Sequence, residues 1–158
     1  MTELLLALQE SAFSTWLRES TSVWAYPTVL TLHTVGLAVL VGVNTTFDLR
    51  VLGFGRDVPL AAIEKWFPAM WTGFWLNAIT GAMLFAIDPI TKGMTLIFFV
   101  KLTLVAAGVA LIVALRGAVY GSPRIPVPMV PFRAKTYALL SLGVWIAAMA
   151  TGRFMAYV

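Results

Sequence analysis

Three ionisable side chains fall inside long apolar stretches of the sequence: His33, Lys101 and Arg153. A charged residue at the centre of a membrane helix costs about 2.5–3.5 kcal/mol on insertion scales, so each needs a partner or a water-filled cavity. An imidazole can bind a metal or carry a proton, and the two cations can pair with carboxylates. Residues placed in this way mark a functional site by default.

The three side chains differ in their expected depth. At about 1.5 Å of rise per helical residue, His33 lies about 13 Å below the outer end of its span, Lys101 about 10 Å and Arg153 about 6 Å. A haem in a membrane requires an imidazole in the apolar zone and cations nearer to water for its propionates. The order of depths therefore predicts a haem held by His33, with Lys101 and Arg153 beside the propionates.

Small residues flank the predicted ligand. Gly36 follows His33 by one helical turn and would leave a flat depression beside the imidazole. Gly73, Asn77 and Gly81 recur at a spacing of four along another helix and offer a second smooth face. We therefore predict that Gly36 and Asn77 contact the cofactor.

The second axial ligand has few candidates. The chain contains one histidine and no cysteine, which excludes paired histidine ligation within one subunit, iron–sulfur clusters and disulfides. Among the seven methionines, Met149 is the one level with His33, because it lies about 12 Å below the outer end of its span. Three options stay open: a five-coordinate haem, Met149 as the partner ligand, or a ligand from another subunit.

Each of these residues also has a purely structural interpretation. Glycines at four-residue spacing commonly form helix-packing contacts in membranes, and Asn77 would serve equally as an interhelical hydrogen-bond donor. Lys101 and Arg153 could extend toward the outer headgroups. His33 is the hardest to explain structurally, because a membrane interior offers few partners for an imidazole.

The composition defines the elements that must position these residues. Of 158 residues, 60% are hydrophobic and 11% are charged, and the mean hydropathy is +0.89, whereas soluble domains have about 25% charged residues. The sequence therefore predicts an all-α integral membrane four-helix bundle, with residues 1–158 forming a single membrane domain. The expected spans are about 24–46, 66–87, 94–115 and 134–157, preceded by an amphipathic interfacial helix over 2–20.

The distribution of basic residues predicts the orientation. The first and third connections carry seven Lys and Arg residues, against Arg18 and Lys92 on the opposite side, which places these connections in the cytoplasm and both termini outside. Asp48 and Arg50 are expected to end the first span, with Arg50 as an anchor. Because the basic residues lie at span ends rather than in an aromatic-interleaved patch, nucleic-acid binding is not expected.

Short motifs of the first and third predicted spans occur together. They are Tyr26-Pro27, Leu32-His33, Gly36, Gly42, Asp48-Leu49-Arg50-Val51-Leu52-Gly53 and Lys101-Leu102. In this combination the sequence resembles a small family of uncharacterised four-helix bacterial membrane proteins, and more distantly the HemJ-type protoporphyrinogen oxidases and CopD-type membrane proteins.

The resemblance implies a bacterial inner membrane, with periplasmic termini, and a b-type haem. His33, Arg50 and Lys101 occupy the positions of the histidine, arginine and lysine of the HemJ-like pattern. The chain departs from that pattern in having no second histidine, which argues against porphyrinogen oxidation. Copper uptake, suggested by the CopD-like similarity, lacks the expected Met-x-x-Met or multiple-histidine cluster.

The leading hypothesis is therefore a cytochrome b-like membrane haem protein that acts in electron transfer or a quinone-linked redox step, as a carrier or an oxidoreductase. One alternative is a protein that binds a quinone, or transports a small solute or a metal ion, with His33 as a proton carrier. Another is a colourless structural subunit of a larger membrane complex. Contact with the lipid bilayer and homo-oligomerisation are expected under every hypothesis.

Overall fold

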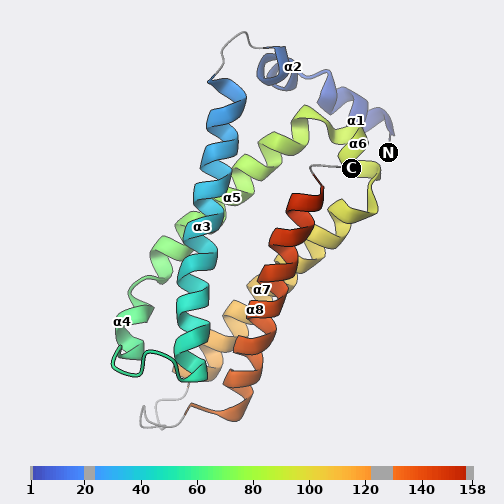
Figure 1. Cartoon of the computed structure of the whole chain (residues 1–158). Helices are drawn as coiled ribbons and strands as arrows, with labels where there is room; N and C mark the ends of the chain where they lie inside the picture. Colours follow the sequence, from blue (N-terminus) through green and yellow to red (C-terminus); the bar gives the residue numbers. More distant parts are fainter. Residues whose placement is uncertain (1, 20–23, 122–129, 156–158) are drawn as a thin grey trace. The chain divides into compact units, whose positions relative to one another are not determined.

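The computed structural model describes residues 2–19, 24–121 and 130–155, and all the regular structure in these ranges is helical (Figure 1). The sequence-based prediction of an all-α chain is confirmed. The helices are α1 (Thr2–Gln9), α2 (Ala12–Glu19), α3 (Ala25–Leu52), α4 (Leu60–Glu64), α5 (Phe67–Ile87), α6 (Pro89–Met94), α7 (Leu96–Tyr120) and α8 (Phe132–Phe154).

Four helical segments are long and apolar enough to cross a membrane: Ala25–Leu52, Leu60–Ile87, Leu96–Tyr120 and Phe132–Phe154. The shortest has 23 residues, and about 20 apolar residues suffice for a bilayer core. Each segment overlaps with one of the four predicted spans, so the chain is a multi-pass membrane protein with an all-α four-helix fold.

The first span is longer than predicted. α3 continues past residue 46 and ends at Leu52, so Asp48 and Arg50 are helical residues and do not terminate it. The helix stops at Gly53, whose φ of 107° lies in the left-handed region. The amide of Phe54 donates to the carbonyl of Leu49 and the amide of Gly53 to that of Arg50, at 3.0 and 3.2 Å. This pattern is a Schellman cap, which glycine favours.

Other boundaries also shift. α7 continues to Tyr120, five residues beyond the predicted end at 115, and the predicted end of the last span at 157 lies outside the described residues. The single helix predicted over 2–20 is two short helices, with the break at Glu10 and Ser11. The Ser11 hydroxyl accepts a hydrogen bond from the Ser14 amide at 3.2 Å, so Ser11 caps the start of α2.

The helices belong to two compact units, Met1–Leu40 with Pro68–Leu96 and Val41–Phe67 with Ile97–Val158. In the first unit the Ser14 hydroxyl of α2 donates to the main-chain oxygen of Ala86, near the end of α5, at 2.6 Å. In the same unit Leu5 of α1 contacts Gly93 of α6. The amino-terminal helices are thus bound to the end of α5, while their interfacial location and the single-domain organisation stay predictions.

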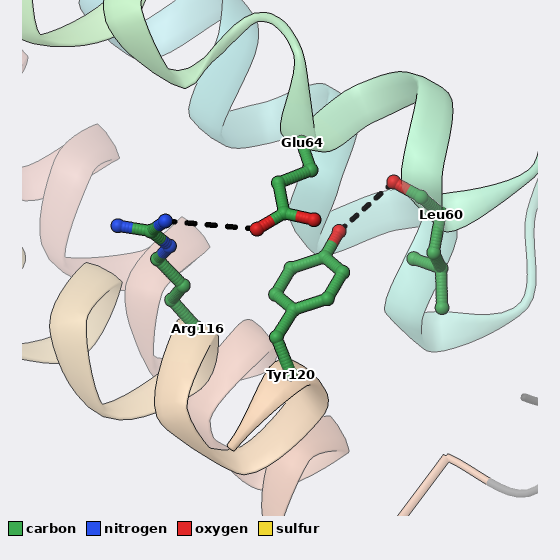
Figure 2. A network of polar contacts seen from close by, with 4 residues as sticks. All are labelled: Leu60, Glu64, Arg116 and Tyr120. Atoms are coloured by element: carbon green, nitrogen blue, oxygen red, sulfur yellow. Dashed lines mark hydrogen bonds and ion pairs between the residues drawn. The ribbon is translucent and has the colours of Figure 1, made fainter. Parts of the chain in front are cut away.

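In the second unit, α4 is attached to the carboxyl end of α7 (Figure 2). The Tyr120 hydroxyl donates to the main-chain oxygen of Leu60 at 2.9 Å, and Arg116 forms an ion pair with Glu64 at 3.6 Å. The Arg116 guanidinium also lies 5.2 Å from the centre of the Phe67 ring. Polar and aromatic contacts therefore fix the short helix that leads into α5.

Arg50 orders the connection between α3 and α4. Its Nε donates to the main-chain oxygen of Val58 at 2.6 Å and its Nη2 to that of Arg56 at 3.2 Å. Arg50, expected as a charge anchor, therefore also bonds to the backbone of the loop that follows α3.

Candidate functional site

His33 lies where α3 and α5 cross within the first unit. The crossing is tight because both helices present glycine there. A Cβ added to Gly36 would lie 2.8 Å from the main-chain oxygen of Gly73 and from the amide nitrogen of Asn77. This is the small-residue contact that lets membrane helices approach closely. The depression predicted beside Gly36 is therefore filled by the backbone of α5.

The imidazole of His33 bonds to α5 through Nδ1. This nitrogen lies 3.0 Å from the main-chain oxygen of Asn77 and 3.1 Å from the Thr80 hydroxyl oxygen. The carbonyl can only accept, and the Thr80 hydroxyl donates to the main-chain oxygen of Leu76 at 2.6 Å. Nδ1 must therefore carry the proton that these bonds share. In a neutral ring this assignment leaves the lone pair on Nε2, and Asn77 Nδ2 is the donor that lies 3.4 Å from it.

Asn77 holds His33 from its side chain as well as from its backbone. The Asn77 Nδ2 atom donates to the main-chain oxygen of His33 at 2.8 Å and lies 3.3 and 3.4 Å from the two ring nitrogens. The interhelical hydrogen bond considered for this residue is present. Its predicted contact with a cofactor stays a prediction.

The remaining glycine of the small-residue stripe supports the ring itself. A Cβ on Gly81 would lie 3.1 Å from Cε1 of His33, so the imidazole lies against the surface of α5 that this glycine leaves open. Gly73, Asn77 and Gly81 all face α3. The stripe expected as a second cofactor face is thus used for packing against α3, and the half-exposed imidazole is oriented by it.

The two predicted propionate partners belong to the second unit. Lys101 of α7 is half-buried beside Gly152 of α8, because a Cβ on this glycine would lie 3.6 Å from the Lys101 ammonium nitrogen. Arg153, the next residue of α8, is exposed. The structure brings the Lys101 ammonium to the segment of α8 that carries Arg153, whereas the relation of both cations to His33 stays a prediction.

Met149, the candidate axial ligand, lies on α8 in the second unit and is exposed. Its role toward His33 therefore stays a prediction. Among the residues that the structure describes, no three of the His, Asp and Glu side chains gather into a metal-binding group.

Sequence reasoning missed a buried polar cluster in the second unit. Asn44 and Asp48 of α3 and Ser141 of α8 are all fully buried. The Asn44 Nδ2 atom donates to Asp48 Oδ2 at 2.7 Å and to Ser141 Oγ at 2.8 Å. Asp48 was expected to end the first span at the membrane surface, whereas its side chain is buried inside the protein.

A signal for this cluster was present in the sequence. Five residues of α3 that recur mostly at spacings of three and four lie on one face of the helix and are all buried: Leu40, Asn44, Phe47, Asp48 and Val51. This is the period of a helix face that packs against a neighbour. Following the apolar members of that face past residue 46 would have placed Asp48 in the interior.

No protein-family model, curated protein or solved structure matches this chain at a significant level. Its function is therefore argued from its own residues.

Proposed function

We propose that the protein is a membrane b-type haem protein in which His33 is an axial ligand, and that it acts in electron transfer or a quinone-linked redox step. The observation that supports this proposal is the hydrogen bond of Nδ1 to the main-chain oxygen of Asn77. Metal-binding histidines almost always donate their other ring N–H to such an acceptor, which fixes the tautomer and raises the basicity of the ligating nitrogen.

The chemistry of the donor set fits haem better than a bare metal ion. A single imidazole is a weak site for an isolated ion, whereas a haem supplies four equatorial nitrogens and needs only axial protein ligands. When bound, the haem supplies a one-electron redox centre.

The residues around His33 have separate tasks in this proposal. The Asn77 carbonyl and the Thr80 hydroxyl hold the proton on Nδ1, and Gly81 supports the ring. A ring held by three contacts from α5 loses little freedom when Nε2 ligates a metal. Lys101 and Arg153 are proposed to bind the propionates through charge-assisted hydrogen bonds.

The proposal includes a location. The excess of basic residues in the first and third connections supports a cytoplasmic position for both, with the termini in the periplasm of a bacterial inner membrane. Homo-oligomerisation is part of the proposal, since another subunit is one source of the second axial ligand.

The test is a haem determination on the purified protein by the pyridine haemochrome assay. We expect haem b in the wild type and its loss in His33→Ala. The matched control is Thr34→Ala, which removes an exposed hydroxyl bonded only to the preceding turn of the same helix. An absence of haem from the wild type, or an equal content in His33→Ala, would refute the proposal.

A structural subunit without cofactor is the second candidate, and the crossing of Gly36 with Gly73 favours it. Backbone contacts of this kind stabilise helix pairs in proteins that carry no prosthetic group. The same assay separates the two candidates, because a structural subunit would be purified free of haem in every variant.

A further inference from the structure

The cluster of Asn44, Asp48 and Ser141 contains two buried oxygens without a partner. Both N–H groups of the Asn44 amide are used, one toward Asp48 and one toward Ser141. Within the described part of the chain, Asn44 Oδ1 and Asp48 Oδ1 accept no hydrogen bond. A buried acceptor left in this state is costly. Both atoms are satisfied either by a proton that Asp48 shares with Asn44 Oδ1 or by an occupant beyond these three side chains.

The missing group must also balance a charge. Asp48 is fully buried, and the described side chains that act on its carboxyl group are the neutral Ser141 and Asn44. An ionised carboxylate inside a membrane protein requires a positive partner. A water molecule could donate to both oxygens but would leave the negative charge in place. A proton on the carboxyl group or a bound monovalent cation meets both requirements, and the test below separates the two.

The oxygens of the cluster suit a hard cation. Two carboxylate oxygens, an amide oxygen and a hydroxyl oxygen come from three side chains that are already joined by hydrogen bonds. Hard cations prefer ligands of these types. Because the cluster holds one carboxylate, a monovalent ion leaves it neutral and a divalent ion does not.

A neighbouring donor supports a hydrated ion. Trp145 follows Ser141 by one turn of α8 and is buried, and its Nε1–H has no acceptor among the described residues. Its ring is held against Gly108 of α7, where an added Cβ would meet the indole. A water molecule that completes the coordination of the ion is the kind of acceptor that this N–H lacks.

We propose that Asn44, Asp48 and Ser141 form a binding site for a monovalent cation, Na⁺. The site stands independently of the haem, since the residues that carry it belong to a different unit from His33. In this arrangement Asp48 supplies the charge, while Asn44 and Ser141 supply neutral oxygens and hold the carboxylate in place.

The test is binding of radioactive ²²Na⁺ to the full chain in detergent, with thermal unfolding measured in NaCl and in choline chloride of equal ionic strength. We expect saturable binding to one site in the wild type. At a Na⁺ concentration tenfold above the dissociation constant, the unfolding midpoint should rise by about 3–6 °C. Choline is too large to enter a buried site and should give no rise.

Two variants locate the site, and a third serves as the control. Asp48→Asn should abolish both the binding and the thermal shift, and Ser141→Ala, which keeps the carboxylate, should weaken the affinity several-fold. Asp57→Asn, in the exposed loop after α3, should bind Na⁺ as the wild type does. If Asp48→Asn does not fold, the wild-type measurement and Ser141→Ala still decide. Absence of specific Na⁺ binding in the wild type would overturn the proposal and indicate a protonated carboxyl group, and equal binding in Asp48→Asn would overturn it as well.

Discussion

The Nδ1 atom of His33 lies 3.0 Å from the main-chain oxygen of Asn77. The acceptor belongs to the backbone of α5, so a substitution of the Asn77 side chain does not remove it. The tautomer of the only histidine in the chain is therefore fixed by a backbone acceptor at the helix crossing, with the Thr80 hydroxyl beside it. The crossing and the candidate ligand are thus one structural feature.

Substitution of Asn77 tests the side-chain half of this contact. Asn77→Leu removes the hydrogen bond from Nδ2 to the main-chain oxygen of His33 and keeps the number and branching of the side-chain heavy atoms. We expect a loss of about 0.6–1.7 kcal/mol in the free energy of unfolding, the range measured for interhelical hydrogen bonds in membranes. Denaturation in detergent micelles would measure it. Because the backbone acceptor persists, haem content should fall less than in His33→Ala, and an equal loss would contradict the orientation argued here.

The glycine crossing provides a second prediction. Gly36→Ala would place its Cβ 2.8 Å from two backbone atoms of α5, which cannot yield as a flexible side chain would. The helices must separate, at a cost of about 1–3 kcal/mol in the free energy of unfolding. Gly42→Ala is the matched control on the same helix, since a Cβ there would meet nothing within 4 Å. Equal stability of the two variants would show that α3 and α5 do not cross at Gly36.

The two polar contacts at the end of α7 should contribute unequally to the free energy of unfolding. Tyr120→Phe removes the hydrogen bond to the main-chain oxygen of Leu60 and should cost about 1 kcal/mol of unfolding free energy. Glu64→Gln breaks an ion pair whose side chains are 40% and 51% exposed, and it should cost less than about 0.5 kcal/mol. Chemical denaturation of the two variants in the same detergent checks the order, and the reverse order would contradict it.

The burial of Lys92 predicts that the free energy of unfolding changes with pH in the alkaline range. Burial lowers the pKa of its ammonium below the ordinary value of 10.5, an effect that Asp88 partly offsets. Between the lowered pKa and 10.5, the unfolded state binds more protons than the folded state, so stability should rise with pH across this window. The ammonium lies 2.8 Å from the main-chain oxygen of Leu84.

The measurement is the denaturation midpoint as a function of pH in wild type and in Lys92→Met. The rise through the window below 10.5 should be present in the wild type and absent from Lys92→Met. Lys65→Met, at an exposed position after α4, controls for the loss of a positive charge and should retain the rise. A wild-type midpoint that falls through this window relative to Lys92→Met would contradict the sign.

The spans and the helix crossing were accessible from the sequence for physical reasons. Long apolar runs define membrane helices without tertiary information. The spacing of Gly73, Asn77 and Gly81 indicated a smooth helix face, and the alternative of helix packing is the one that the structure shows. The predicted end of the first span at residue 46 is wrong, because that prediction treats Asp48 and Arg50 as surface charges. In the sequence, a buried aspartate such as Asp48 cannot be told apart from one that ends a helix in water. The hydrogen bonds of Asn44 to Asp48 and to Ser141 of α8 show that Asp48 is buried between helices.

The grouping of His33, Lys101 and Arg153 was predicted from their depths alone, but depth does not determine which faces of two helices meet. The proximity of Lys101 to Gly152 depends on the rotation of α7 and α8 about their axes. That rotation is set by packing of residues far apart in sequence, such as Gly108 with Trp145. A hydropathy pattern averaged along a span carries little of this information.

The most direct test of the haem proposal is a reduced-minus-oxidised absorption spectrum of His33→Gly, recorded with and without added imidazole beside the wild type. We predict b-type bands in the wild type, their loss in His33→Gly, and their recovery when free imidazole occupies the space left by the missing ring. A wild type without haem bands, or His33→Gly with bands that do not depend on imidazole, would contradict His33 as the ligand.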